Sequence, residues 1–226
     1  MTQPPGPTLP EELLLLALDP RRGRPYCRNR FLEYAMAGAA LAELELQGRI
    51  TEQRGEIQVV NPLEPADPVL AALLRSLPAP GKGRSGVTTR GWVRDAGRPA
   101  ADMCLESLVQ RGVLIQETRR FLGLLPYHRH PAGPQSYAGP VRERFAAAER
   151  AGLPDHRSRA LAALVAAAGL DPHVPGAGLS SRSAMRSLIH ERWPAHAVYR
   201  NVRQDKSDAS GRRAAGGAPM NTGSGS

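Results

Sequence analysis

The sequence has few aromatic residues, few cysteines and no apolar run long enough to cross a membrane. Aromatic residues make up 4% of its 226 residues, so the core must be built from Leu, Ala and Val, which pack readily between helices. Glu33, Glu43 and Glu45 interrupt the longest apolar stretches. None of these stretches reaches the ~20 residues that a membrane-spanning helix needs. Any membrane contact is therefore expected to be peripheral.

The two cysteines exclude a disulfide framework. Cys27 stands beside arginines and Cys104 lies far away in an apolar helical pattern, which fits a reducing cytoplasm. His128 and His130 form half of a metal-binding pattern, but no Cys or carboxylate stands near them at a ligand spacing. We therefore expect neither a metal nor a cofactor. Residues 1–10 lack the basic and apolar regions of a signal peptide.

Charge of one sign prevails. The formal net charge is +9 and the isoelectric point is near 10.5, with 30 basic residues against 21 acidic ones. Such a surplus favours polyanions, either nucleic acid or the phosphate-rich surface of a membrane. The alternative is that an Arg-rich composition leaves the surface basic without any ligand.

The apolar periodicity predicts a mainly α-helical single domain. Thr8 and Glu11 have the spacing of a capping box at the start of a first apolar helix. Residues 31–47 are apolar nearly all round, which predicts a buried central helix. Residues 49–60 alternate around Arg54-Gly55, which predicts a β-hairpin. Further helices are predicted over residues 69–77, 140–151, 156–168, 181–189 and 193–202.

A helix–glycine–hairpin unit is predicted to occur twice. Residues 105–126 match residues 41–62 at an offset of 64, with Gly48 opposite Gly112 and Ile57 opposite Phe121. The domain is expected to span residues 8–203, after a flexible N-terminus over residues 1–7. Residues 204–226 are rich in Gly, Ser, Ala and charges and are expected to form a disordered tail.

Five motifs follow one another along the chain: Thr8–Leu18, Gly38–Ile50, Val59–Pro62, Asp67–Leu70 and Leu105–Leu114. In this order they resemble the Golgi phosphoprotein 3 family, in particular its bacterial, actinobacterial branch. The central motif ends in Leu46-Gln47-Gly48-Arg49-Ile50, close to the Leu-x-x-Leu-x-Gly-Arg-Ile ending that is typical of the family. The resemblance extends from about Thr8 to Val202.

The resemblance implies a helical, non-enzymatic protein. In Golgi members it implies binding of phosphatidylinositol 4-phosphate and recruitment of membrane enzymes by their cytosolic tails. The family holds the headgroup with a Trp and three Arg, and these positions fall at Arg28, Ala37, Arg98 and Ala101. Only Arg98 matches that pattern.

The residues themselves predict an anion-binding face that includes Arg98. Arg90, Arg94 and Arg98 recur every four residues, which places them on one face if the helix continues past Gly91 and Gly97. Guanidinium groups suit phosphate oxygens. Arg28 and Arg30 flank this cluster. The alternative is a solvated basic helix whose charges pair with Asp95, Asp102 and Glu106.

The sequence thus predicts a cytoplasmic, peripherally membrane-associated adaptor that binds anionic phospholipid headgroups, with cytosolic tails of membrane proteins as further partners and homo-oligomerisation left open. One alternative is a winged-helix nucleic-acid-binding protein, because a helix followed by a basic-tipped hairpin occurs twice. Glu43, Glu45 and Glu106 on those helices argue against base recognition. The other alternative is a protein-interaction scaffold that does not bind lipid.

Overall fold

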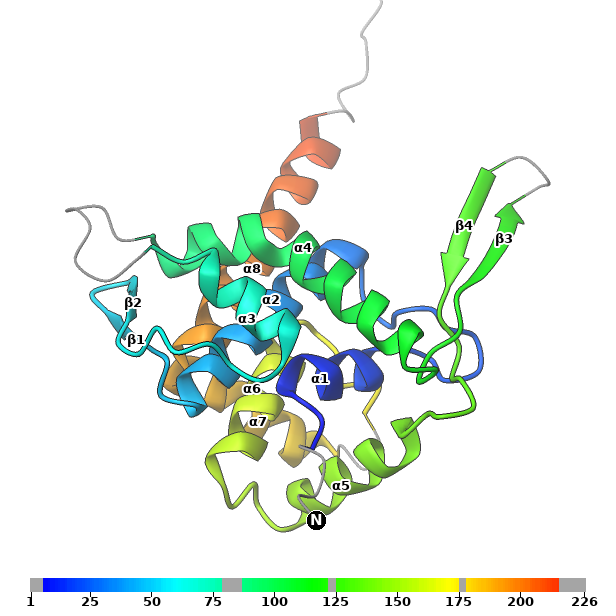
Figure 1. Cartoon of the computed structure of the whole chain (residues 1–226). Coiled ribbons are helices and arrows are strands. Elements are labelled where there is room, and N and C mark those ends of the chain that lie inside the picture. Colours follow the sequence, from blue (N-terminus) through cyan, green and yellow to red (C-terminus); the bar gives the residue numbers. More distant parts are fainter. Residues whose placement is uncertain (1–5, 79–86, 122–124, 175–177, 216–226) are drawn as a thin grey trace, which may run out of the picture.

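The computed structural model describes residues 6–78, 87–121, 125–174 and 178–215. It is mainly helical with two small antiparallel hairpins (Figure 1), as predicted. The elements are α1 (Leu9–Ala17), α2 (Asn29–Leu46), β1 (Ile50–Gln53), β2 (Glu56–Val59), α3 (Pro68–Arg75), α4 (Thr89–Gln110), β3 (Glu117–Phe121), β4 (Leu125–Arg129), α5 (Ala138–Arg150), α6 (His156–Ala167), α7 (Leu179–Glu191) and α8 (Trp193–Ala215).

Helix α1 begins at the predicted capping box. The backbone N–H of Thr8 donates to the Glu11 carboxylate at 3.0 Å, and Pro10 occupies the first turn, where its missing N–H leaves no intrahelical bond unmade. Every residue of α1 is buried. The short helix therefore depends on the helices packed around it, because nine residues alone are too few to be stable in water.

Helix α2 is the buried centre of the domain, as predicted. It contacts α1, α4, α6 and α8, and Ala35, Ala39 and Ala40 on it are fully buried. Two glycines bring neighbouring helices close to it. A Cβ at Gly97 of α4 would lie 3.0 Å from the backbone of Glu33, and a Cβ at Gly38 would overlap the side chain of Val198. Small residues thus set the spacing between these helices.

Three buried carboxylates join α1 and α2 to the surrounding helices. Glu43 accepts from the backbone N–H of Leu9 at 2.8 Å and from Arg157 at 2.8 Å. Arg157 also donates to Glu12 at 3.2 Å. Arg144 and Arg111 pair with Glu12 and Glu11, respectively. Since a buried charge is costly unless it is paired, these arginines are structural and are not part of a ligand-binding surface.

The predicted repeat is confirmed as far as its glycines. Gly48 follows α2 and Gly112 follows α4, and both have positive φ angles, 65° and 68°. The return bonds match as well, because Arg49 donates to the Leu44 carbonyl and Val113 to the Leu108 carbonyl, each at 2.9 Å. Such left-handed residues end helices without strain only when they are glycine.

Beyond those glycines the expected equivalence is wrong. Ile57 lies in β2, whereas Phe121, its predicted counterpart, ends β3. The second hairpin therefore begins later relative to its glycine than the first does. It also extends away from the helical body (Figure 1). The first hairpin, by contrast, is bonded to the start of α4, because the Gly55 carbonyl accepts from the backbone N–H of Thr89 at 2.9 Å.

The C-terminal prediction requires correction. Helix α8 does not end near residue 202 but continues to Ala215, while residues 216–226 lie outside the described part of the chain. The extension is attached to α2, because the Tyr34 hydroxyl donates to Asp205 at 3.1 Å and Arg30 lies 4.0 Å from the same carboxylate. Within the helix, Gln204 donates to Asp208 at 2.8 Å. A few polar contacts can thus order a segment that offers little apolar surface.

The N-terminal segment expected to be flexible is partly attached. Residues 1–5 lie outside the described part of the chain, but the Pro7 carbonyl accepts from Arg157 at 2.6 Å.

Trp92 is a core residue, 4% exposed, and its indole N–H donates to Ser76 at 3.2 Å.

Replacing Gly38 with Ala should destabilise the fold. The new methyl group would overlap Val198 and lie 2.9 Å from Leu164, so we expect a loss of about 1–3 kcal/mol in the free energy of unfolding. Gly211→Ala is the matched control, because nothing lies within 4 Å of a Cβ there, and it should leave the free energy of unfolding unchanged or raise it by up to about 1 kcal/mol, since Ala has the higher helix propensity. Urea denaturation of both variants would measure the difference, and equal midpoints would contradict the close packing of α2.

Truncation after Gln204 should lower the melting temperature. It removes Asp205, which accepts from Tyr34, at a cost of about 1 kcal/mol. For a domain of this size that corresponds to about 2–4 °C. Truncation after Ala215 should leave the melting temperature unchanged. If both truncated proteins melt at the same temperature, the extension of α8 contributes nothing to stability.

Candidate basic ligand-binding site

The helix that carries Arg90, Arg94 and Arg98 is unbroken, as their spacing on one face required. Helix α4 is continuous from Thr89 to Gln110 across both glycines and Pro99, and the hydroxyl of Thr88 caps it by accepting from Gly91 at 3.2 Å. Arg94 and Arg98 are exposed one turn apart, while Arg90 is half-buried. The predicted spacing therefore holds, but the three side chains have different surroundings.

A hollow of about 600 Å³ brings Arg30, Arg90 and Arg94 together; we call it the α2–α4 hollow. Asp205 and Asp208 of α8 also line it. Three formal positive charges thus face two negative ones. The α2–α4 hollow is basic, but the C-terminal extension of α8 partly neutralises it.

Arg30 is mainly a structural residue in this hollow. Its Nε donates to the Tyr34 hydroxyl at 2.8 Å, and its guanidinium lies 3.6 Å from Glu33. The hydrogen bond to Tyr34 raises the pKa of Arg30, and burial raises the pKa of Tyr34. The Nε of Arg30 is therefore engaged by Tyr34, and its charge is partly balanced by Glu33 and Asp205.

Arg28 lies in a neighbouring hollow of about 430 Å³, which Phe31 and Lys206 also line. The guanidinium of Arg28 lies 5.6 Å from the centre of the Phe31 ring, and the ammonium of Lys206 lies 5.5 Å from it. Two cations therefore share one aromatic ring. Lys206 was not predicted, because it lies in the segment expected to be disordered.

Arg98 lies apart from both hollows, although it is the one match to the family's headgroup pattern. It is well exposed, and its Nε lies 3.6 Å from Asp102 in an i,i+4 pair. The family's other two Arg positions, Ala37 and Ala101, are 0% and 5% exposed. The family's pattern is therefore not rebuilt by these residues, and the structure distributes the five predicted arginines over three places.

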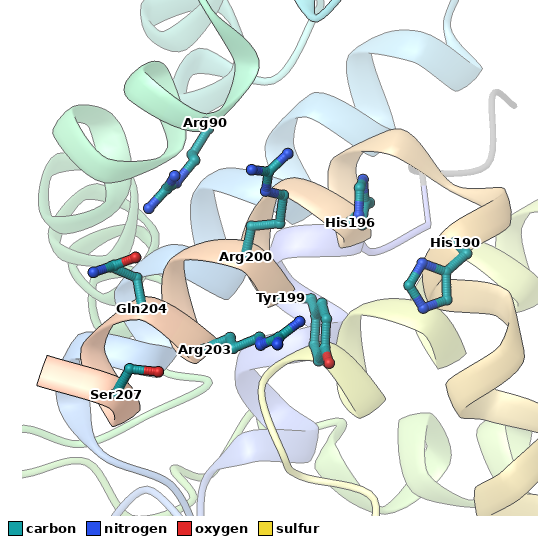
Figure 2. A pocket seen from close by; sticks show the side chains of 8 residues that line it. All are labelled: Arg90, His190, His196, Tyr199, Arg200, Arg203, Gln204 and Ser207. Atoms are coloured by element: carbon teal, nitrogen blue, oxygen red, sulfur yellow. The ribbon is translucent and has the colours of Figure 1, made fainter. Parts of the chain in front are cut away.

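A second basic hollow was missed altogether. It lies between α4, α7 and α8, has a volume of about 480 Å³, and is lined by Arg90, Arg200 and Arg203 with His190 and His196 (Figure 2). We call it the α7–α8 hollow. The signal was a helical stripe in which basic residues recur every three to four positions from 196 to 203. It was missed because the helix was expected to end at residue 202.

His128 and the two cysteines do not gather into a metal-binding group in the described part of the chain. Among the residues that the structure describes, no group of three His, Cys, Asp or Glu side chains could hold a metal ion. His128 lies 3.3 Å from the Thr118 hydroxyl across the β3–β4 hairpin. Burial raises the pKa of the Cys27 thiol to about 11, and Cys104 is buried in the core.

The helical body, the hairpins that follow left-handed glycines, and the exposed arginines define a small helical domain with a basic surface. Residues 9–204 match the family model of Golgi phosphoprotein 3 (GPP34). The chain therefore belongs to the Golgi phosphoprotein 3 family, a family of non-enzymatic, adaptor-type proteins. No curated protein matches the chain. Within the described residues, no helix has both the length and the apolar character needed to cross a membrane.

Cys27 should react slowly in the folded protein. With its pKa raised to about 11 by burial, only about one thiol in a thousand is ionised at pH 8, and the thiolate is the reactive form. Mass spectrometry after a brief iodoacetamide pulse should find Cys27 largely unmodified, whereas denaturant should expose both cysteines. Modification of folded Cys27 as fast as a free thiol would contradict its burial.

Proposed function

We propose that the protein is a peripheral membrane adaptor that binds anionic lipid headgroups of the phosphoinositide type. The observation that carries the proposal is the pair Arg94 and Arg98, exposed one turn apart on α4. Family membership supports an adaptor role. The cytosolic tails of membrane proteins would be its partners, and the cytoplasmic face of a membrane its place of action.

The dispersed basic residues suit a surface better than a single enclosed ligand. Arg94 faces the α2–α4 hollow, Arg98 lies one turn further along α4, and Arg28 and Lys206 lie over Phe31. Each basic residue near an anionic membrane contributes roughly 1 kcal/mol of attraction. Several dispersed cations can therefore hold the protein at a membrane without a deep headgroup pocket.

Nucleic-acid binding is less well supported by the packing. A recognition helix must present its side chains to the major groove, but α2, which precedes the first hairpin, is the buried centre of the domain. The exposed part of α4 includes Asp95, Asp102 and Glu106, which would repel phosphates. Helix α2 offers no exposed face to a groove, and on α4 the exposed Arg94 and Arg98 are interspersed with these acids, so neither helix presents the uninterrupted polar face that base recognition favours.

Neutralising Arg94 and Arg98 should weaken binding to anionic vesicles. The Arg94→Gln/Arg98→Gln variant loses two cations, or roughly 2 kcal/mol of attraction, which corresponds to a decrease of about thirtyfold in the partition coefficient. Sedimentation with phosphatidylcholine vesicles that contain phosphatidylinositol 4-phosphate would measure it. Binding of the unmodified protein should also fall steeply with added salt.

The matched control is Arg75→Gln/Arg150→Gln, which removes the same charge from the ends of α3 and α5. It should bind vesicles nearly as well as the unmodified protein. An equal loss in both variants would show that net charge alone matters and that the α4 face is not the site. Failure of the unmodified protein to bind at low salt would reject the membrane proposal in favour of a protein-interaction scaffold.

A further inference from the structure

The α7–α8 hollow differs from the α2–α4 hollow in its balance of basic and acidic residues. Arg90, Arg200 and Arg203 line it together with His190 and His196, and none of the eight described residues that line it is acidic. The α2–α4 hollow, by contrast, includes Asp205 and Asp208. Three guanidinium groups without a facing carboxylate repel one another, and an anion between them would relieve that repulsion.

The fold holds Arg90 in place at the edge of this hollow. Asn201 is completely buried, and its amide N–H donates to the Arg90 carbonyl at 3.0 Å while its amide oxygen accepts from the Arg90 Nε at 3.1 Å. A buried amide with both ends bonded fixes the side chain that it holds. Arg90 thus presents its terminal amino groups to the hollow with little further loss of side-chain entropy.

Helix α8 supplies most of the remaining donors from one stripe. His196, Tyr199, Arg200 and Arg203 lie three to four residues apart and line the hollow. Figure 2 shows them along α8, with Arg200 on the side of Arg90. In the described residues, neither Arg200 nor Arg203 has a hydrogen bond or an ion pair to a protein group. The guanidinium N–H groups of Arg200 and Arg203 are therefore free to bind a ligand, whereas the Nε of Arg30 is bonded to Tyr34.

The two histidines add a further reason to expect an anion. Their rings lie 5.4 Å apart, and the edge of Tyr199 lies against His190 with the ring centres 5.9 Å apart. Burial lowers the pKa of His196, and the nearby His190 and Arg200 lower it further. The charged or titratable groups that face this pair are Arg90 from α4 and Tyr199, Arg200 and Arg203 from α8. None of them can neutralise a protonated imidazole.

We propose that the α7–α8 hollow is a binding site for a phosphate monoester, with Arg90, Arg200 and Arg203 as the donors to its oxygens. Guanidinium groups bind phosphate oxygens in a bidentate manner, and the imidazoles can donate further bonds. A volume of about 480 Å³ falls in the range of small-molecule sites and leaves room for the esterified group as well as the phosphate. The ester is either a free metabolite or a lipid headgroup.

This inference goes beyond the proposed function and does not depend on it. The membrane surface is proposed at Arg94 and Arg98 of α4, whereas the phosphate site is built on α7 and α8. Arg90 and Gln204 are the residues that line both hollows. Variants that avoid these two residues can therefore test the two sites separately.

Titration of the full chain with inorganic phosphate and with glycerol 2-phosphate, followed by NMR of the histidine ring protons, tests the site. Both probes should shift the His190 and His196 resonances in a saturable way. Arg200→Gln/Arg203→Gln should weaken binding by about tenfold or more, since two charge-assisted contacts are lost. Arg94→Gln/Arg98→Gln, which removes the same charge, should bind phosphate within about twofold of the unmodified protein.

A second pair of variants keeps every arginine in place and guards against misfolding. Ser207 lines the hollow and Ser210 is exposed on the same helix outside that lining. Ser207→Glu should weaken phosphate binding because it introduces the missing negative charge, whereas Ser210→Glu should not. The absence of saturable binding by the unmodified protein, or equal losses in the members of either pair, would overturn the proposal.

Vesicles identify the source of the phosphate. If the natural ligand is a lipid headgroup, Arg200→Gln/Arg203→Gln should also lose binding to phosphatidylcholine vesicles that contain phosphatidylinositol 4-phosphate. If it is a soluble ester, that variant should bind vesicles normally while its phosphate titration is impaired. Phosphate binding without any vesicle binding would refute the membrane proposal and support the phosphate site. Vesicle binding without saturable phosphate binding would refute the phosphate site and support the membrane proposal.

Discussion

The close approach of helices to α2 is the constraint on which the rest of the structure depends. Alanine covers much of the surface of α2. Gly38 of α2 allows α8 to approach closely, and Gly97 of α4 allows α4 to approach the backbone of α2. Because these contacts leave little room for a methyl group, close packing constrains the relative positions of α2, α4 and α8. Residues of α4 and α8 line both the α2–α4 hollow and the α7–α8 hollow, so the shapes of these hollows follow from the core.

The paired charges complement this packing. An Ala-rich core buries less apolar area for each residue than one rich in Leu or Phe. Here the buried carboxylates of Glu11, Glu12 and Glu43 add hydrogen bonds and ion pairs that join α1 and α2 to three other helices. Removing one member would leave a buried charge without its partner, which is far more damaging than losing a surface pair. Some arginines of this protein thus pair with buried carboxylates and stabilise the fold, whereas others line the basic hollows.

The sequence predicted the helices well where apolar residues repeat and poorly where polar contacts decide. The capping box at Thr8, the buried α2 and the glycines that end α2 and α4 follow from local chemistry and were predicted. The extension of α8 was not, because Asp205 is attached by Tyr34, a residue 171 positions away. The candidate site was predicted incompletely for the same reason, because contacts between distant residues decide its geometry. Spacing placed Arg90, Arg94 and Arg98 on one helix, but it could not show that Asn201 fixes one of them.

The position of Arg90 has a consequence for regulation. Its guanidinium lines both the α2–α4 hollow and the α7–α8 hollow, and its Nε is already bonded to Asn201. Only its terminal amino groups remain, so two anions bound at once would have to share them. Occupancy of one hollow would then reduce the affinity of the other, and thermodynamic linkage makes this antagonism reciprocal.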